Sequence, residues 1–295
     1  MRNFPSSFIL LFTLTFLAVH LAHAAIIEVH GHRGARARFP ENTLPAFEYA
    51  MKLGADYLEM DMAVTKDGVI VISHDPEVSG LICLDPHGKP IQDPPLIHTL
   101  TLKQVQSYDC GTLKNLRFSS QTPVPGTHIP TLDQVFEMVQ KNKDPHAKTV
   151  RFNIETKIFK DHPEYSIDPD SFVKKFLKVV KNHNMEKRVI LQSFDFRTLD
   201  AIWKDEPAIP RVALIEDANE DMIQIAKDHH VNIISPNFSI INKSTVQKLH
   251  ALGVKVVPWT ADDETVWKEL VSMNVDGIIS DDPEALMHYL AKEER

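Results

Sequence analysis

Short apolar runs alternate with helical patterns along this chain, and this alternation constrains the fold more than any other feature of the sequence. Eight runs, most of them rich in β-branched residues, lie at 26–29, 57–62, 150–154, 189–192, 212–215, 231–234, 254–258 and 277–279. Most are followed by a segment of helical periodicity, with N-cap residues, a capping box or a terminal glycine as boundary signals. Strand and helix alternating eight times predict an α/β fold, a (β/α)8 TIM barrel.

The first 24 residues differ in kind from the rest of the chain. Arg2 precedes an apolar run from Phe8 to Leu21, and Ala22-His23-Ala24 is a small-residue cleavage pattern. These features predict a secretory signal peptide at 1–24. A membrane anchor is the alternative, but the run is shorter than the ~20 residues that span a bilayer. We expect an exported protein, periplasmic or secreted, in which residues 25–295 form one barrel domain.

The charge balance restricts the partners of the mature chain. Removing residues 1–24 removes one of the 32 basic residues and none of the 40 acidic ones, so the formal charge goes from −8 to −9. An acidic protein does not attract nucleic acid or anionic membranes non-specifically. We therefore expect a small-molecule substrate, no nucleic acid and no stable membrane association, and the oligomeric state stays open.

A hairpin interrupts the alternation after the second strand. Lys66-Asp67-Gly68 separates that strand from a second extended run at 69–73, and Asp-Gly between two such runs predicts a tight turn. An antiparallel return brings residues on either side of the turn together. His74 is therefore expected beside Glu59 and Asp61.

The segment 76–130 has little periodicity and is rich in Pro, Asp, His and Thr. We predict an insertion over the active face of the barrel; a small second domain is the alternative, although so short a segment buries little apolar surface alone. It contains Cys83 and Cys110, the only two cysteines of the chain. Export favours a disulfide between them, and two buried free thiols are the alternative.

Polar side chains gather at the predicted carboxyl ends of the strands, where barrel enzymes place their catalytic groups. Glu59 and Asp61 are two residues apart and so lie on one side of their strand, and Glu155 ends the next strand. Three carboxylates in a low-dielectric site repel one another unless a cation neutralises them, and oxygen ligands favour Mg²⁺ or Ca²⁺ over zinc. An ion-pair network with Arg33 and Lys157 is the alternative.

Seven short motifs carry a resemblance to a known family. They are HRGARARFPENT from His32, EMD from Glu59, VISHD ending at Asp75, NIETK from Asn153, QSF from Gln192, PWT from Pro258 and SDDP from Ser280. In this order, across nearly all of the mature chain, they resemble the glycerophosphodiester phosphodiesterase family, in its bacterial exported type. Two departures, Ser280 in place of threonine and Thr156 in place of an apolar residue, lie at positions without an evident chemical role.

The resemblance implies a role for each matched residue. His32 and His74 match the general acid/base pair, and Glu59, Asp61 and Glu155 match the ligands of one divalent cation. The residues matched to substrate binding are Arg33 and Lys157 at the phosphate, Trp259 at the glycerol pocket, and Gln192 in the QSF motif. The implied reaction is hydrolysis of glycerophosphodiesters to glycerol 3-phosphate and an alcohol.

Two other functions compete with this one. A phospholipase D-like hydrolysis of lysophospholipids uses similar residues, but it calls for apolar loops on the active face, and 76–130 is mainly polar. Asn42 in the PENT segment argues against the sphingomyelin-cleaving branch. A non-catalytic binder of glycerol phosphates is disfavoured because both histidines and all three acids are present.

Overall fold

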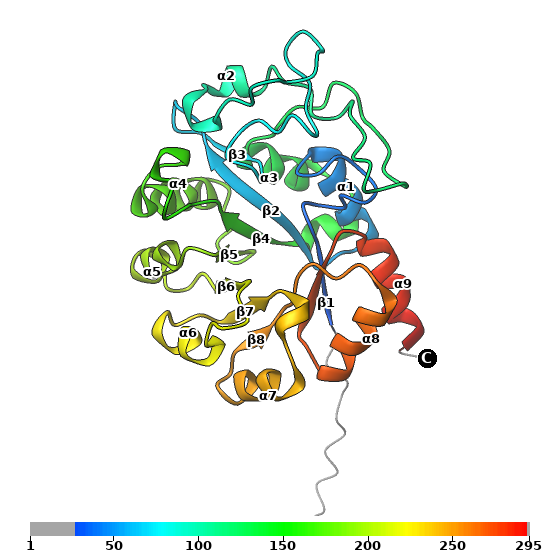
Figure 1. The fold of residues 1–295 in the computed structure, drawn as a ribbon, viewed down its shortest axis with the longest axis vertical. Coiled ribbons are helices and arrows are strands. Elements are labelled where there is room, and N and C mark those ends of the chain that lie inside the picture. Colours follow the sequence, from blue (N-terminus) through cyan, green and yellow to red (C-terminus); the bar gives the residue numbers. More distant parts are fainter. Residues whose placement is uncertain (1–26, 294–295) are drawn as a thin grey trace, which may run out of the picture.

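The structure, a computed structural model, describes residues 27–293, and in it parallel strands form a ring surrounded by helices (Figure 1). The parallel strands are β1 (Glu28–Gly31), β2 (Tyr57–Val64), β4 (Arg151–Thr156), β5 (Val189–Ser193), β6 (Arg211–Ile215), β7 (Ile233–Pro236), β8 (Lys255–Val256) and β9 (Gly277–Ser280). The predicted (β/α)8 barrel is confirmed, and each predicted run overlaps one of these strands. The predicted signal peptide lies outside the described residues.

The barrel closes between its last two strands. Pairing runs in the order β8-β7-β6-β5-β4-β2-β1-β9, with all neighbours along this path parallel. Beyond the short β8, the backbone N–H groups of Asp276 and Ile279 donate to the carbonyls of Val256 and Pro258, both at 2.9 Å. These hydrogen bonds join β8 and its extension to β9, so the carboxyl ends of all eight strands surround one mouth.

Helices cover the outside of the ring, as the amphipathic patterns predict. Those around the ring (Figure 1) are α1 (Leu44–Leu53), α3 (Leu132–Lys141), α4 (Pro169–Asn182), α5 (Phe196–Asp205), α6 (Met222–Asp228), α7 (Lys243–Ala251), α8 (Glu264–Met273) and α9 (Pro283–Glu293), and the short α2 (Leu102–Val105) lies in the segment 76–130. The predicted capping box begins α3, where Thr131 accepts from the Gln134 N–H at 3.1 Å and the Gln134 side chain accepts from the Thr131 N–H at 2.8 Å. The main core, with Phe47 and Phe136, lies between these helices and the sheet.

A second, smaller core fills the inside of the ring. It consists of Tyr57, Ile190, Val212, Ile233, Val257 and Ile279, with Trp259 packed at its edge. These side chains belong to different strands and close the barrel below the mouth, as the inward-facing layers of such barrels do. The polar residues of the mouth therefore rest on an apolar floor.

The predicted hairpin is confirmed. β3 (Ile70–Ile72) returns antiparallel to β2, with Met62 opposite Ile72 and Val64 opposite Ile70. The Ser73 N–H donates to the Asp61 carbonyl at 2.9 Å, which continues the ladder toward the mouth. His74 follows directly, so the hairpin delivers it to the site from outside the ring.

The segment 76–130 lies over the hairpin, at the end of the barrel where β2 and β3 meet α2 (Figure 1). It builds a small apolar cluster against the hairpin residues Ala63 and Val71. Cys83 and Cys110 are joined by a disulfide with sulfur atoms 2.05 Å apart, and both are buried. Gln121 Nε2 donates to the Arg36 carbonyl at 2.7 Å, which attaches the far end of the insertion to the loop after β1.

Candidate active site and metal centre

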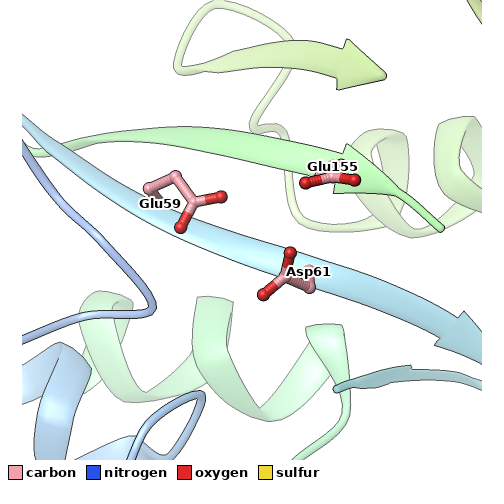
Figure 2. Close-up of side chains that lie close together, drawn as sticks. All are labelled: Glu59, Asp61 and Glu155. Carbon is pink, nitrogen blue, oxygen red and sulfur yellow. The ribbon is translucent and has the colours of Figure 1, made fainter. Parts of the chain in front are cut away.

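Three carboxylates converge at the mouth of the barrel. Glu59 and Asp61 project from β2 and Glu155 from the adjacent β4 (Figure 2). Asp61 and Glu155 are directly opposite each other in the parallel pairing. One oxygen from each of the three residues lies within 4.8 Å of the others, and all three side chains are buried. The arrangement follows from the two-residue spacing on β2 and from the register of β2 with β4.

The charges on these carboxylates are unequally compensated. Burial raises the pKa of Glu59 well above its usual range, and the charge of Asp61 raises it further. Burial alone would raise the pKa of Asp61 too, but the cationic Lys157 and Arg33 hold it well below its usual range. Burial also raises the pKa of Glu155. Asp61 therefore ionises more readily than either glutamate, because burial disfavours the ionised forms of Glu59 and Glu155.

Lys157 contributes the nearest positive charge. Its Nζ lies 2.7 Å from Glu155 Oε1 and 3.1 Å from Asp61 Oδ1. Arg33 Nε lies 3.4 Å from Asp61 Oδ2. Arg33 is shared with Glu41, whose Oε1 lies 2.5 Å from Arg33 Nη1. The two cationic side chains are therefore divided among the carboxylates of Glu41, Asp61 and Glu155.

The residues present fit a hard divalent cation. The three converging ligand atoms are all carboxylate oxygens, the donors that Mg²⁺ and Ca²⁺ prefer. Two amides orient them, since Asn42 Nδ2 donates to Asp61 Oδ2 at 2.8 Å and Gln192 Nε2 donates to Glu59 Oε1 at 2.6 Å. A divalent cation beside Glu59 would favour its ionised form, against the burial and the charge of Asp61 that raise its pKa.

The loop after β1 approaches the carboxylates closely because two glycines permit it. The Arg33 N–H donates to Glu59 Oε2 at 2.8 Å. A Cβ on Gly31 would lie 2.2 Å from the Gly34 carbonyl oxygen, and one on Gly34 would lie 2.7 Å from the backbone of Ala46. Gly34 also has a φ of 87°, which favours glycine. The loop therefore needs glycine at both positions to present Arg33.

The two histidines reach the site from opposite directions. His32, after β1, has a side chain only 13% exposed, and its Nε2 lies 3.9 Å from Glu59 Oε2. Burial lowers the pKa of His32 well below its usual value, and the charges of Arg33 and Arg36 lower it further. His74 is half-exposed, with its Nδ1 2.8 Å from Asp75 Oδ1. His32 Nδ1 lies 2.6 Å from Asp281 Oδ1, so each imidazole has a carboxylate at Nδ1.

A cavity of about 230 Å³ contains all of these groups. The nine residues predicted to catalyse, bind substrate or bind metal all line it: His32, Arg33, Glu59, Asp61, His74, Glu155, Lys157, Gln192 and Trp259. Gln192, predicted to bind substrate, also donates a hydrogen bond to Glu59, a predicted metal ligand. One wall is apolar, where Trp259 packs edge-on against Phe194 with ring centroids 5.5 Å apart and donates from Nε1 to the Ser235 carbonyl at 2.8 Å.

Sequence reasoning missed several lining residues. Arg36, Arg117, Phe194 and Leu214 also border the cavity. Arg36 lies in the HRGARARF motif and Phe194 in the QSF motif, so these motifs were a signal from which both could have been predicted as site residues. Arg117 belongs to the aperiodic insertion and Leu214 is one apolar residue of a strand, so neither has a signal in the sequence.

The comparison with known sequences agrees with this geometry. A sequence model of the glycerophosphoryl diester phosphodiesterase family matches residues 32–285. The chain belongs to this family. The match includes every strand from β2 onward and each of the residues that line the cavity, so the resemblance carried by the seven motifs is confirmed.

Individual relatives extend over nearly the whole chain. A glycerophosphodiester phosphodiesterase from Caldanaerobacter subterraneus is 30% identical over 264 residues, 90% of this chain and 98% of the relative. A human lysophospholipase D is 24% identical over 320 residues, 97% of this chain and 93% of the relative. A solved structure from Silicibacter pomeroyi, provisionally assigned as a glycerophosphoryl diester phosphodiesterase, has a TM-score of 0.86 and 25% identity over 92% of this chain and 95% of its own.

Between residues 27 and 293, none of the helices is both long and apolar enough to cross a membrane.

Cation binding should depend on pH in a defined direction. Glu59 and Glu155 have raised pKa values, and a cation binds the ionised carboxylate, so binding should release protons and tighten as the pH rises through the raised pKa values of the two glutamates. Calorimetric titration with Mg²⁺ and Ca²⁺ measures this. Glu59→Gln should weaken binding at least about tenfold and flatten the pH dependence, whereas the exposed control Glu137→Gln should change neither. An affinity independent of pH in the unmutated protein would contradict the assignment.

Proposed function

We propose that this chain hydrolyses glycerophosphodiesters to glycerol 3-phosphate and an alcohol, with one divalent cation, Mg²⁺ or Ca²⁺, bound by Glu59, Asp61 and Glu155. The observation that carries the proposal is the convergence of these three carboxylates in one cavity with two histidines and four basic residues. Family membership and the activity named for the bacterial relative support the same substrate class.

Binding the phosphodiester is assigned to the basic residues of the cavity. A phosphodiester anion repels nucleophiles, so positive charge at its non-bridging oxygens lowers the barrier. A cation on the three carboxylates would supply Lewis-acid stabilisation of that charge. Arg33 and Lys157 flank the carboxylates, and their donors can bind the same oxygens, with the planar guanidinium suited to two parallel hydrogen bonds.

Proton transfer is assigned to His32 and His74. One deprotonates the nucleophile and the other protonates the departing alcohol, a division that suits imidazole because a ring nitrogen can either accept or donate a proton. Their Nδ1 atoms contact Asp281 and Asp75, which leaves each Nε2 for the substrate. The nucleophile is water or the neighbouring glycerol hydroxyl, and the family resemblance favours the hydroxyl, through a cyclic phosphate that is then hydrolysed.

The rest of the cavity fits a small polyol. The apolar wall of Phe194, Leu214 and Trp259 can cover the carbon side of glycerol while its hydroxyls face the polar groups. At about 230 Å³ the cavity is smaller than the ~300 to 1,000 Å³ of sites for drug-sized molecules, which favours a short substrate over one with an acyl chain inside it.

Lysophospholipid hydrolysis is the second candidate, and two observations favour it. The insertion exposes Leu81 and Leu116, at 83% and 94%, so it is less polar than its composition indicates. An open groove lined by Phe159 and Phe196 adjoins the cavity at Phe194 and could receive an apolar chain. The human relative is also named for this activity, as a lysophospholipase D.

We also propose that the protein acts outside the cytoplasm. The disulfide between Cys83 and Cys110 supports this location, because such bonds persist in oxidising compartments. The signal-peptide pattern at 1–24 supports it independently.

A substrate panel tests the function directly. Glycerophosphocholine with Mg²⁺ or Ca²⁺ should release glycerol 3-phosphate and choline, and a chelator should abolish the release until the cation is restored. Lysophosphatidylcholine, assayed in parallel, should react more slowly. Faster release of lysophosphatidate would favour the second candidate. Binding of glycerol 3-phosphate without turnover of any diester would indicate a non-catalytic binder.

Each histidine can be given its role by varying the leaving group. His32→Ala and His74→Ala should each lower turnover of glycerophosphocholine at least about 10²-fold. With a p-nitrophenyl ester, whose phenolate leaves without protonation, the variant that lacks the general acid should recover most of its rate. The exposed control His87→Ala should stay within about twofold of the unmutated enzyme. Near-normal turnover in either active-site variant would remove that residue from the mechanism.

A further inference from the structure

We propose that Asp281 is a positioning residue that fixes the orientation and the tautomer of His32. It belongs to the SDDP segment, which the proposed reaction does not otherwise use. The inference rests on the proposed function only in taking His32 as a proton-transfer group.

Asp281 and His32 are in direct contact although 249 residues separate them. His32 Nδ1 lies 2.6 Å from Asp281 Oδ1, and the aspartate is almost fully buried. The contact arises because β1 and β9 are neighbours in the closed barrel, with Gly31 opposite Ser280. Both residues directly follow those partners at the carboxyl ends of their strands.

Main-chain hydrogen bonds fix both sides of the contact. The His32 N–H donates to the Ser280 carbonyl at 2.9 Å, and the Ala37 N–H donates to the Asp281 carbonyl at 3.0 Å. The Asp281 N–H in turn donates to Asp262 Oδ1 at 2.7 Å. With the backbone held on both strands, the carboxylate has a defined position against the imidazole.

The tautomer follows from the chemistry of the two groups. An ionised carboxylate only accepts hydrogen bonds, so the neutral imidazole must carry its proton on Nδ1. Nε2 is then an acceptor, and it faces the cavity 3.9 Å from Glu59 Oε2. Without Asp281, the proton could reside on Nε2, or the ring could rotate. In either case Nε2 would no longer direct a lone pair toward the substrate.

Other charged groups surround Asp281, and their effects on His32 must be distinguished from that of Asp281. Arg36 Nε lies 2.6 Å from the same Oδ1, and Arg117 from the insertion lies 3.7 Å from Oδ2. Asp262 lies on the other side, where burial and the neighbouring Asp281 raise its pKa to about 6. Arg36 balances the buried charge of Asp281, so a variant at Arg36 distinguishes charge balance from the hydrogen bond to His32.

His74 offers an internal comparison. Its Nδ1 contact is with Asp75, the next residue in the chain, and both side chains are 38% exposed. Solvent can replace that contact, whereas His32 is buried and has no other partner at Nδ1 among residues 27–293. Loss of Asp281 should therefore affect His32 more than loss of Asp75 affects His74.

The experiment compares Asp281→Asn with Arg36→Gln and Asp75→Asn in the full chain. The amide has nearly the same volume but no charge, so its oxygen accepts a weaker hydrogen bond than the carboxylate, and its NH2 group can donate to Nδ1 instead. Asp281→Asn should lower kcat about 10- to 100-fold with KM within about threefold, because the substrate contacts are untouched. In ¹⁵N-histidine NMR, the hydrogen-bonded Nδ1–H signal, assigned by its absence in His32→Ala, should disappear. Arg36→Gln and Asp75→Asn should retain that signal.

Two results would overturn the inference. One is a kcat for Asp281→Asn within about threefold of the unmutated enzyme while the variant stays folded; the other is an Nδ1–H signal that persists in both Asp281→Asn and Asp281→Ala, whose methyl group accepts no hydrogen bond. An equal loss of the signal in Arg36→Gln would assign the effect to charge balance and also contradict the proposal. The NMR signal does not depend on turnover, so failure of the proposed reaction on every diester would be distinguishable from failure of the tautomer assignment.

Discussion

Electrostatic repulsion among three buried carboxylates determines the design of the barrel mouth. Asp61 stays ionised because Lys157 and Arg33 contact it, while the pKa values of Glu59 and Glu155 rise in their buried positions. The surrounding residues stabilise the carboxylates with hydrogen bonds. The side-chain amide of Asn42 donates to Asp61 and that of Gln192 donates to Glu59. In the loop after β1, the backbone N–H of Arg33 also donates to Glu59.

The barrel makes such a concentration of charge possible by separating stability from chemistry. Apolar side chains fill the ring below the mouth and the layer between sheet and helices, so the polar residues at the strand ends do not have to stabilise the fold. Two segments outside the regular barrel, the hairpin and the insertion, add residues to the mouth. The hairpin delivers His74 from outside the ring, and the insertion, with its own apolar cluster and disulfide, brings Arg117 over the cavity.

The sequence was most informative where function depends on local spacing. Two-residue periodicity placed Glu59 and Asp61 on one side of a strand, and the Asp-Gly turn returned His74 to them. Longer-range contacts had no such signal. The bond between Asp281 and His32 requires closure of the barrel, and the approach of Arg117 depends on the path of an aperiodic loop. The exposure of Leu81 and Leu116 could not be predicted either. The composition of a segment does not tell which of its side chains face solvent.

The central claim is that Glu59, Asp61 and Glu155 bind one cation. A crystal structure with Mn²⁺, which scatters anomalously, and glycerol 3-phosphate tests it most directly. The account predicts one anomalous peak in coordination contact with an oxygen of each carboxylate, at about 2.0 to 2.6 Å, with the phosphate on the side of His32 and His74. A peak elsewhere, or Lys157 still occupying the space between Asp61 and Glu155 with no ion beside it, would contradict it.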